Sequence, residues 1–137
     1  MRLGNPKIAV DTHAEENGKW VECPEAWWYS PDKPMRILIR GATTRRHSLL
    51  LQRLTKGLTA KEIDERAIEI QQDLACDVIL NWENHFDTEG KTIIYSPDVA
   101  SKVIHNHDNR RYTEYVISVA RSLSTFNPEQ LEEVEKN

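Results

Sequence analysis

The chain lacks any long hydrophobic run. No apolar stretch approaches the roughly 20 residues that a membrane-spanning helix requires. The first residues, MRLGNPKIAVDTH, also lack the apolar segment of a secretory signal peptide. We therefore expect neither export nor a membrane as a partner.

Cysteine is scarce, and basic residues are not in surplus. Cys23 and Cys76 lie far apart and form no CxxC motif, so two reduced thiols in an intracellular protein are the simplest interpretation, with a disulfide as the alternative. Lys and Arg number 18 against 22 Asp and Glu, and this net charge of −4 argues against a dedicated nucleic-acid binder. The 137 residues, 39% hydrophobic and 29% charged, are instead typical of one globular domain.

The first part of the chain favours strands. Residues 1–17 show little periodicity and are expected to form an extended lead-in. Farther on, the apolar residues Met35, Ile37 and Ile39 follow an approximate period of two. A Pro- and Ser-containing connection precedes them, so residues 18–41 predict a two-stranded ribbon that must dock on the rest of the protein.

Helical periodicity dominates from residue 43 onwards. The clearest helix start is Thr59 with Glu62, which form a capping box ahead of apolar residues at three- and four-residue steps. Ser96 and Pro97 mark another start. We expect a mainly α fold: a single-domain helical bundle over 18–126 with a small N-terminal β-hairpin or ribbon, followed by a short acidic C-terminal helix or tail over 127–137. The predicted helices cover residues 43–56, 59–83, 97–105 and 109–124.

The histidines offer little basis for catalysis or metal binding. His105 and His107 diverge on a helix, and no Cys or carboxylate group completes a metal site beside them. Glu83, His85 and Asp87 alternate along the chain, but the sequence indicates neither an orienting third group nor a pocket. A solvated loop and an ordinary packing segment are the plainer interpretations. We therefore expect no enzyme, no metal and no cofactor.

A basic cluster opens the helix predicted over 43–56. Its members, Arg45, Arg46 and His47, could contact phosphates, and a helix, a Gly-containing turn and a second helix follow in the order of a helix-turn-helix. The helix that would enter the DNA groove carries acids that repel phosphate, namely Glu62, Asp64, Glu65 and Glu69. A solvated face, or pairing with acids elsewhere in the chain, is favoured, and nucleic acid is not expected as a partner.

Aromatic residues gather in two places. Trp27, Trp28 and Tyr29 lie in the Pro-containing connection, and adjacent Trp side chains do not easily both point inward. These three residues are therefore a candidate interaction surface, with capping of the protein's own core as the alternative. The second place, residues 81–97, has an acidic turn at Gly90 between apolar residues. We call those apolar residues the joint: Trp82, Phe86, Ile93, Ile94 and Tyr95.

The joint resembles part of the small tail assembly chaperones of long-tailed bacteriophages, over roughly residues 75–137. The resemblance implies that the joint is scaffold rather than active site, and that it sets how the helix over 59–83 packs on the helix from Ser96. The residues that carry the resemblance are Trp82-Glu83, the acidic turn Asp87 to Gly90, Tyr95-Ser96-Pro97 and the acidic end Glu132 to Asn137.

The resemblance also implies a role. Members of this family are non-enzymatic, bind the tape measure protein during tail morphogenesis in the host cytoplasm, and are absent from the mature virion. They commonly occur as a short form and a longer frameshifted form. A chaperone needs exposed apolar surface, so we expect a homo-oligomer or partner binding through Trp27 and Trp28. The alternatives are a minor tail or head–tail structural protein, an unrelated interaction module and, least favoured, a metal-dependent enzyme.

The C-terminal residues generate a prediction about the gene. Glu135-Lys136-Asn137 can be encoded GAA-AAA-AAC, which contains A-AAA-AAC, a heptamer on which two tRNAs can slip back by one nucleotide and still pair. Since the resemblance implies a longer frameshifted product, we expect this heptamer and an open −1 frame beyond it. The nucleotide sequence of the gene tests this prediction. Codons such as GAG-AAG-AAT, or a −1 frame that is closed after the heptamer, would exclude the frameshift.

Overall fold

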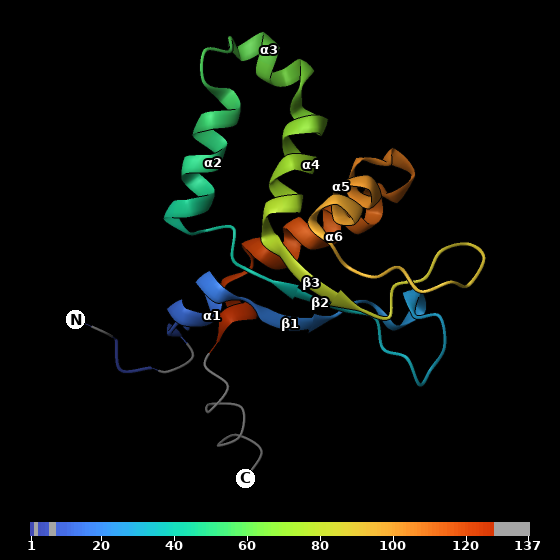
Figure 1. Cartoon of the computed structure of the whole chain (residues 1–137). Helices are drawn as coiled ribbons and strands as arrows, with labels where there is room; N and C mark the ends of the chain where they lie inside the picture. Colours follow the sequence, from blue (N-terminus) through green and yellow to red (C-terminus); the bar gives the residue numbers. More distant parts are fainter. Residues whose placement is uncertain (2, 6–7, 128–137) are drawn as a thin grey trace.

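A three-stranded antiparallel sheet lies beneath a layer of helices, and a helical arm projects from one end of it (Figure 1). The computed structural model describes residues 1, 3–5 and 8–127. The strands β1 (Lys19–Glu22), β2 (Arg36–Ile39) and β3 (Ile79–Glu83) lie in the order β1-β2-β3. Val21 pairs with Ile37, which pairs with Trp82, so one row of apolar side chains crosses the sheet.

The third strand shows that the expected fold class is wrong. The segment predicted as one helix over 59–83 forms two helices, α3 (Ala60–Glu65) and α4 (Ala67–Val78), followed by the strand β3. The protein is therefore mixed α/β rather than a helical bundle with a small ribbon. Ile79 and Trp82 continue the helical spacing of Leu74 and Val78, and their separation of three positions does not fit strict strand alternation. Pairing with β2 forms the strand nevertheless, because a register shift between Leu38 and Ile39 lets both residues be buried.

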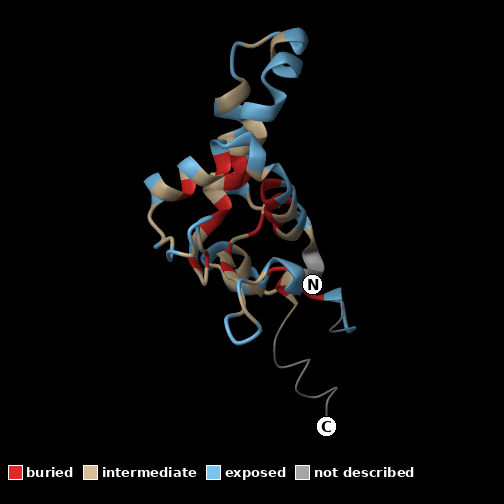
Figure 2. Ribbon diagram, turned by 90° about the vertical axis from the view of Figure 1, so that its right-hand side faces the viewer, coloured by how far each residue is buried: buried red, intermediate tan, exposed pale blue. Residues whose placement is uncertain are grey.

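The arm consists of α2 (Arg45–Thr55), α3 and α4 (Figure 1). The helix expected over 43–56 begins at Arg45, after Thr44, whose side chain accepts from the His47 backbone amide. Thr59 and Glu62 form the capping box that the sequence predicts. Burial is confined to the base of the arm, and most of the outer part is exposed (Figure 2). The buried residues of these helices are His47, Leu74, Ala75 and Val78.

The core lies between the sheet and the helices α4, α5 (Pro97–His105) and α6 (Arg110–Arg121). Ser96 caps α5 and Pro97 occupies its first turn, as the sequence predicts. Ile104 and Val116 are fully buried at the centre of this layer. Short 3-10 helices complete the connections: η2 (Glu25–Trp27), η3 (His107–Asn109) and η4 (Leu123–Phe126).

The segment expected as an extended lead-in contains a helix, α1 (Thr12–Asn17), capped by the Asp11 side chain. The Asp11 backbone amide donates to the carbonyl of the buried Phe126 at 2.6 Å, which ties this segment to η4. The acidic helix or tail predicted over 127–137 lies, beyond residue 127, outside the described residues. No helix in the described part of the chain is both long enough and apolar enough to cross a membrane.

Replacing Trp82 by Ala should lower the free energy of unfolding by about 3–5 kcal/mol, because the ring is buried and its removal leaves a cavity. The change also removes the donor to the Ile93 carbonyl. Urea denaturation of the purified variant measures the effect. Ile94→Ala is the control, since that side chain is 79% exposed. A loss below about 1 kcal/mol for Trp82→Ala would contradict the assigned packing.

Candidate functional site

The joint is a packed aromatic corner. The indole N–H of Trp82 donates to the Ile93 carbonyl at 2.7 Å, and Tyr95 meets the Trp82 ring edge-on with centroids 5.2 Å apart. The Tyr95 hydroxyl donates to the Ile79 carbonyl at 3.1 Å, and Phe86 is half-buried beside the acidic turn. Ile94 is exposed and points away from this corner, so the structure brings together four of the five residues of the joint.

The aromatic loop packs against the joint, a contact that sequence reasoning did not foresee. Tyr29 stacks on Phe86 with centroids 4.7 Å apart, and its hydroxyl lies so close to Gly90 that a Cβ there would approach it to 2.8 Å. Trp28 is half-buried and donates through its indole N–H to the Cys23 carbonyl. Trp27 stays 36% exposed, edge-on to Tyr115 at 5.4 Å. The two aromatic groups therefore form one surface.

A hollow of about 510 Å³ opens where this surface meets α5 and α6. We call it the aromatic pocket, defined by the lining residues Trp27, His85, Phe86, Ile93 and Tyr112. Its rim carries charges of both signs and amides: Asp87, Asn106, Asp108, Asn109 and Arg111. Aromatic walls with a few polar groups at the rim suit binding of an apolar side chain or a small ligand.

His85 forms the floor of the pocket and is only 5% exposed. Its ring stacks on Trp82 with centroids 4.4 Å apart. The Nδ1 atom lies 3.0 Å from the Glu83 carbonyl, which can only accept, so Nδ1 carries the proton and Nε2 accepts from the Tyr112 hydroxyl at 2.7 Å. Burial lowers the pKa of His85 to about 4 and raises the pKa of Tyr112. Both side chains are neutral and satisfied by each other.

The other members of the alternating trio are occupied elsewhere. Glu83 pairs with Arg36 on the neighbouring strand. The Asp87 carboxylate accepts from the backbone amides of Glu89 and Lys91 and so closes the acidic turn. Neither carboxylate is a hydrogen-bond partner of the His85 ring, whose contacts are the Glu83 carbonyl and the Tyr112 hydroxyl, and this arrangement favours packing over acid–base chemistry.

The remaining candidates for catalysis or metal binding, two histidines and two cysteines, do not come together in one site in the described part of the chain. The pKa of His105 is raised by its hydrogen bond to the Ser101 carbonyl and then by Asp73, whose carboxylate lies 2.9 Å from Nε2. His107 lies in η3. Both cysteines are free, and burial raises the pKa of Cys23 to about 12 and that of Cys76 to about 11. Among residues 1, 3–5 and 8–127, no three His, Cys, Asp or Glu side chains are placed to hold a metal ion.

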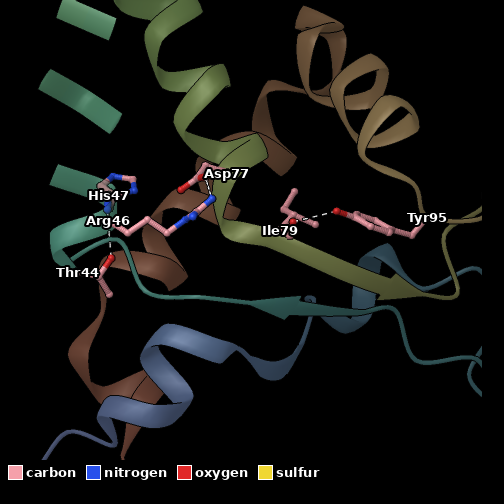
Figure 3. A network of polar contacts seen from close by, with 6 residues as sticks. All are labelled: Thr44, Arg46, His47, Asp77, Ile79 and Tyr95. Carbon is pink, nitrogen blue, oxygen red and sulfur yellow. Dashed lines mark hydrogen bonds and ion pairs between the residues drawn. The ribbon is translucent and has the colours of Figure 1, made fainter. Parts of the chain in front are cut away.

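The basic cluster lies at the base of the arm (Figure 3). Arg46 pairs with Asp77 of α4 at 2.9 Å, which is the pairing with a distant acid that the sequence favoured over phosphate contact. Burial lowers the pKa of His47 and of Arg40. In the described part of the chain, buried polar atoms of Arg40, His47 and Asp77 find no hydrogen-bond partner, so this junction carries a desolvation cost.

A protein-family model described as YdaY prophage protein matches residues 40–137. The chain belongs to this family. The protein is therefore phage-derived, which confirms the phage origin expected from the resemblance, while the family description names no tail assembly role. The matched residues include the arm, the joint and both helices of the pocket, but Trp27 and Tyr29 lie before them. No curated protein and no solved structure matched the chain.

Stability should fall as the pH drops from about 6.5 to about 4. The pKa of His85 is lower in the folded than in the unfolded chain. In this pH window the unfolded chain therefore binds the extra proton, which stabilises the unfolded state relative to the folded one. The full effect is about 3 kcal/mol. Urea denaturation across this range should show a smaller fall for His85→Phe combined with Tyr112→Phe, which keeps both rings and removes the buried polar pair. An unchanged pH dependence in that variant would contradict the assignment.

Proposed function

We propose that this phage-derived protein is a non-enzymatic tail assembly chaperone that binds the tape measure protein during tail morphogenesis. The observation that carries the proposal is the aromatic pocket, which has a partly exposed Trp27 at its mouth. The resemblance of the joint to tail assembly chaperones and the membership of a prophage family support it. The protein would act in the host cytoplasm and be left out of the mature virion.

The pocket suits recognition of an apolar side chain. Trp and Tyr residues dominate binding energies at protein interfaces when they border a pocket that loses its water on binding. Trp27 meets this description, because it lines the pocket and its ring is held by Tyr115. Asp108 and Arg111 at the rim can orient the polar flanks of the client.

Binding is favoured over catalysis because the titratable groups that line the pocket floor are engaged. His85 and Tyr112 satisfy each other inside the protein, and burial keeps both in their neutral forms near pH 7. A ligand in the pocket would therefore meet ring faces and rim charges rather than a free proton donor or acceptor.

The competing proposal is a minor tail or head–tail structural protein. The two differ in where the chain ends up, since a structural protein stays in the particle and a chaperone leaves it. Mass spectrometry of purified virions separates them: stoichiometric recovery of the chain would favour the structural role.

Trp27→Ala should weaken binding of the tape measure protein encoded by the same prophage by about 30-fold or more, the size expected for an interface hot spot. Co-purification and titration of the two proteins measure the loss. Trp20→Ala is the matched control, because Trp20 on β1 is 38% exposed and does not line the pocket. Equal behaviour of the two variants would argue against the pocket as the client site.

A further inference from the structure

The outer part of the arm is rich in apolar residues but buries none of them. All residues from 48 to 73 are described, and every one is exposed or half-buried. The core covers this stretch only in part, through Leu50, Leu54 and Ile70. An apolar helix face that is left open in this way normally packs against another element or a partner. The large aliphatic residues of the stretch are Leu49, Leu50, Leu51, Leu54, Leu58, Ile63, Ile68 and Ile70.

Part of this apolar surface lines a hollow of about 440 Å³ between the two legs of the arm (Figure 1). We use leg for α2 on one side and for α3 with α4 on the other. Leu51 of α2, 41% exposed, lines the hollow from one leg, and Ile63 of α3, 36% exposed, lines it from the other together with Ala67 and Ile70. Leu49 is 44% exposed on the same helix as Leu51 but lies outside the lining.

The two legs carry opposite charges. Residues 45–56 contain four basic residues and no acid, whereas residues 60–78 contain six acids and two basic residues. Between described residues, the one ion pair that joins the legs is Arg46 with Asp77, 2.9 Å apart at the base of the arm. The exposed charges farther out, such as Arg53 and Lys56 on one leg and Asp64 on the other, have no ion-pair partner in the opposite leg.

This charge pattern makes the arm complementary to a second copy of itself. Two copies can bring their hollows together about a two-fold axis in two ways. An axis along the arm sets each α2 against α3 and α4 of the other copy, whereas an axis across the arm sets α2 against α2. Opposite charges meet in the first pairing and like charges in the second, and the symmetry makes each contact occur twice. The charges therefore select the first pairing.

A second copy also suits the arm because the arm needs cover in the free protein. Its helices have 11, 6 and 12 residues. Helices of this length are marginal in water by themselves and gain most of their stability by packing an apolar face. A client protein supplies such packing only while it is bound, whereas a second copy is present wherever the protein is made.

We propose that the protein forms a homodimer through its arms, with α2 of each copy packed on α3 and α4 of the other. Leu51 and Ile63 of the two copies cover one another over the joined hollows, and the basic leg of each copy lies beside the acidic leg of its partner. The arm does not line the aromatic pocket, so the inference is independent of the proposed function and leaves that pocket open in both copies.

Sedimentation of the full chain at several concentrations measures the association. Leu51→Glu places a charge in the apolar contact and should raise the dissociation constant of the dimer by roughly 30-fold or more. Leu49→Glu is the matched control, because it makes the same change on the same helix at a similarly exposed site outside the hollow. A chain that is monomeric at every concentration, or equal weakening by both variants, would overturn the proposal. Dissociation by Trp27→Ala but not by Leu51→Glu would move the interface to the aromatic loop and equally overturn it.

Charge reversal tests which legs meet. Arg53→Glu with Lys56→Glu makes the outer ends of both legs acidic, and Asp64→Lys with Glu65→Lys makes both basic. Each double variant alone should dissociate, since like charges then face each other, and an equimolar mixture should form the dimer again. Recovery in the mixture also shows that both variants are folded. Variants that dimerise alone as well as the unsubstituted chain, or a mixture that stays monomeric, would contradict the pairing of α2 with α3 and α4.

Amide hydrogen exchange reports on the same contact without any substitution. Dilution of the unsubstituted chain below the dissociation constant should speed exchange in α3 and in the outer turns of α2 and α4, because these turns lose their cover. Exchange in β2, which lies in the sheet, should stay the same. Exchange in α3 that does not depend on concentration while the dimer dissociates would place the interface elsewhere and overturn the proposal.

Discussion

The structure depends on the junction at which α4 becomes β3 without an intervening loop. The last carbonyls of a helix have no partner within it, and a buried helix end needs donors from elsewhere. Here the Arg40 backbone amide donates to the Val78 carbonyl at 2.9 Å. The Tyr95 hydroxyl donates to the Ile79 carbonyl at 3.1 Å (Figure 3). The first donor follows β2 and the second belongs to the joint. Two hydrogen bonds therefore fix the arm, the sheet and the joint relative to one another.

The character of the aromatic pocket follows from this junction. A register shift between Leu38 and Ile39 lets Ile79 pair with Ile39 and Trp82 pair with Ile37, so both are buried although they lie three positions apart. The Trp82 ring then stacks on His85. His85 then forms hydrogen bonds with the Glu83 carbonyl and the Tyr112 hydroxyl, so both ring nitrogens already have partners inside the protein and are not available to a ligand. A floor whose polar groups are satisfied inside the protein leaves ring faces and rim charges to meet a partner. Such a surface is suited to recognition rather than proton transfer.

Sequence reasoning succeeded where the signal is local. The capping box of Thr59 and the start at Ser96 depend on residues within one helical turn, and both are present. It failed where a distant partner decides, because Ile79 and Trp82 follow helical spacing, and only pairing with β2 through a register shift buries both of them in a strand. The same limit hid the stacking of Tyr29 on Phe86, since no local pattern links a loop between two strands to a turn after the third. Trp27, Phe86 and Ile93 of the pocket lining were therefore recognisable in advance, but their assembly into one pocket was not.

The extent of the family match has a structural consequence. Residues 40–137 contain β3 but neither β1 nor β2, so the matched part by itself would leave Ile79 and Trp82 without the strand that pairs with them. Ile37 and Ile39, both buried, come from the preceding residues, as does Trp27 at the pocket mouth. The pocket is thus composite: the matched part supplies its floor and the helices behind it, and the first 39 residues supply its outer wall and the sheet that holds the floor in place. A change in the N-terminal loop can therefore alter what the pocket accepts without disturbing the α4–β3 junction on which the fold rests.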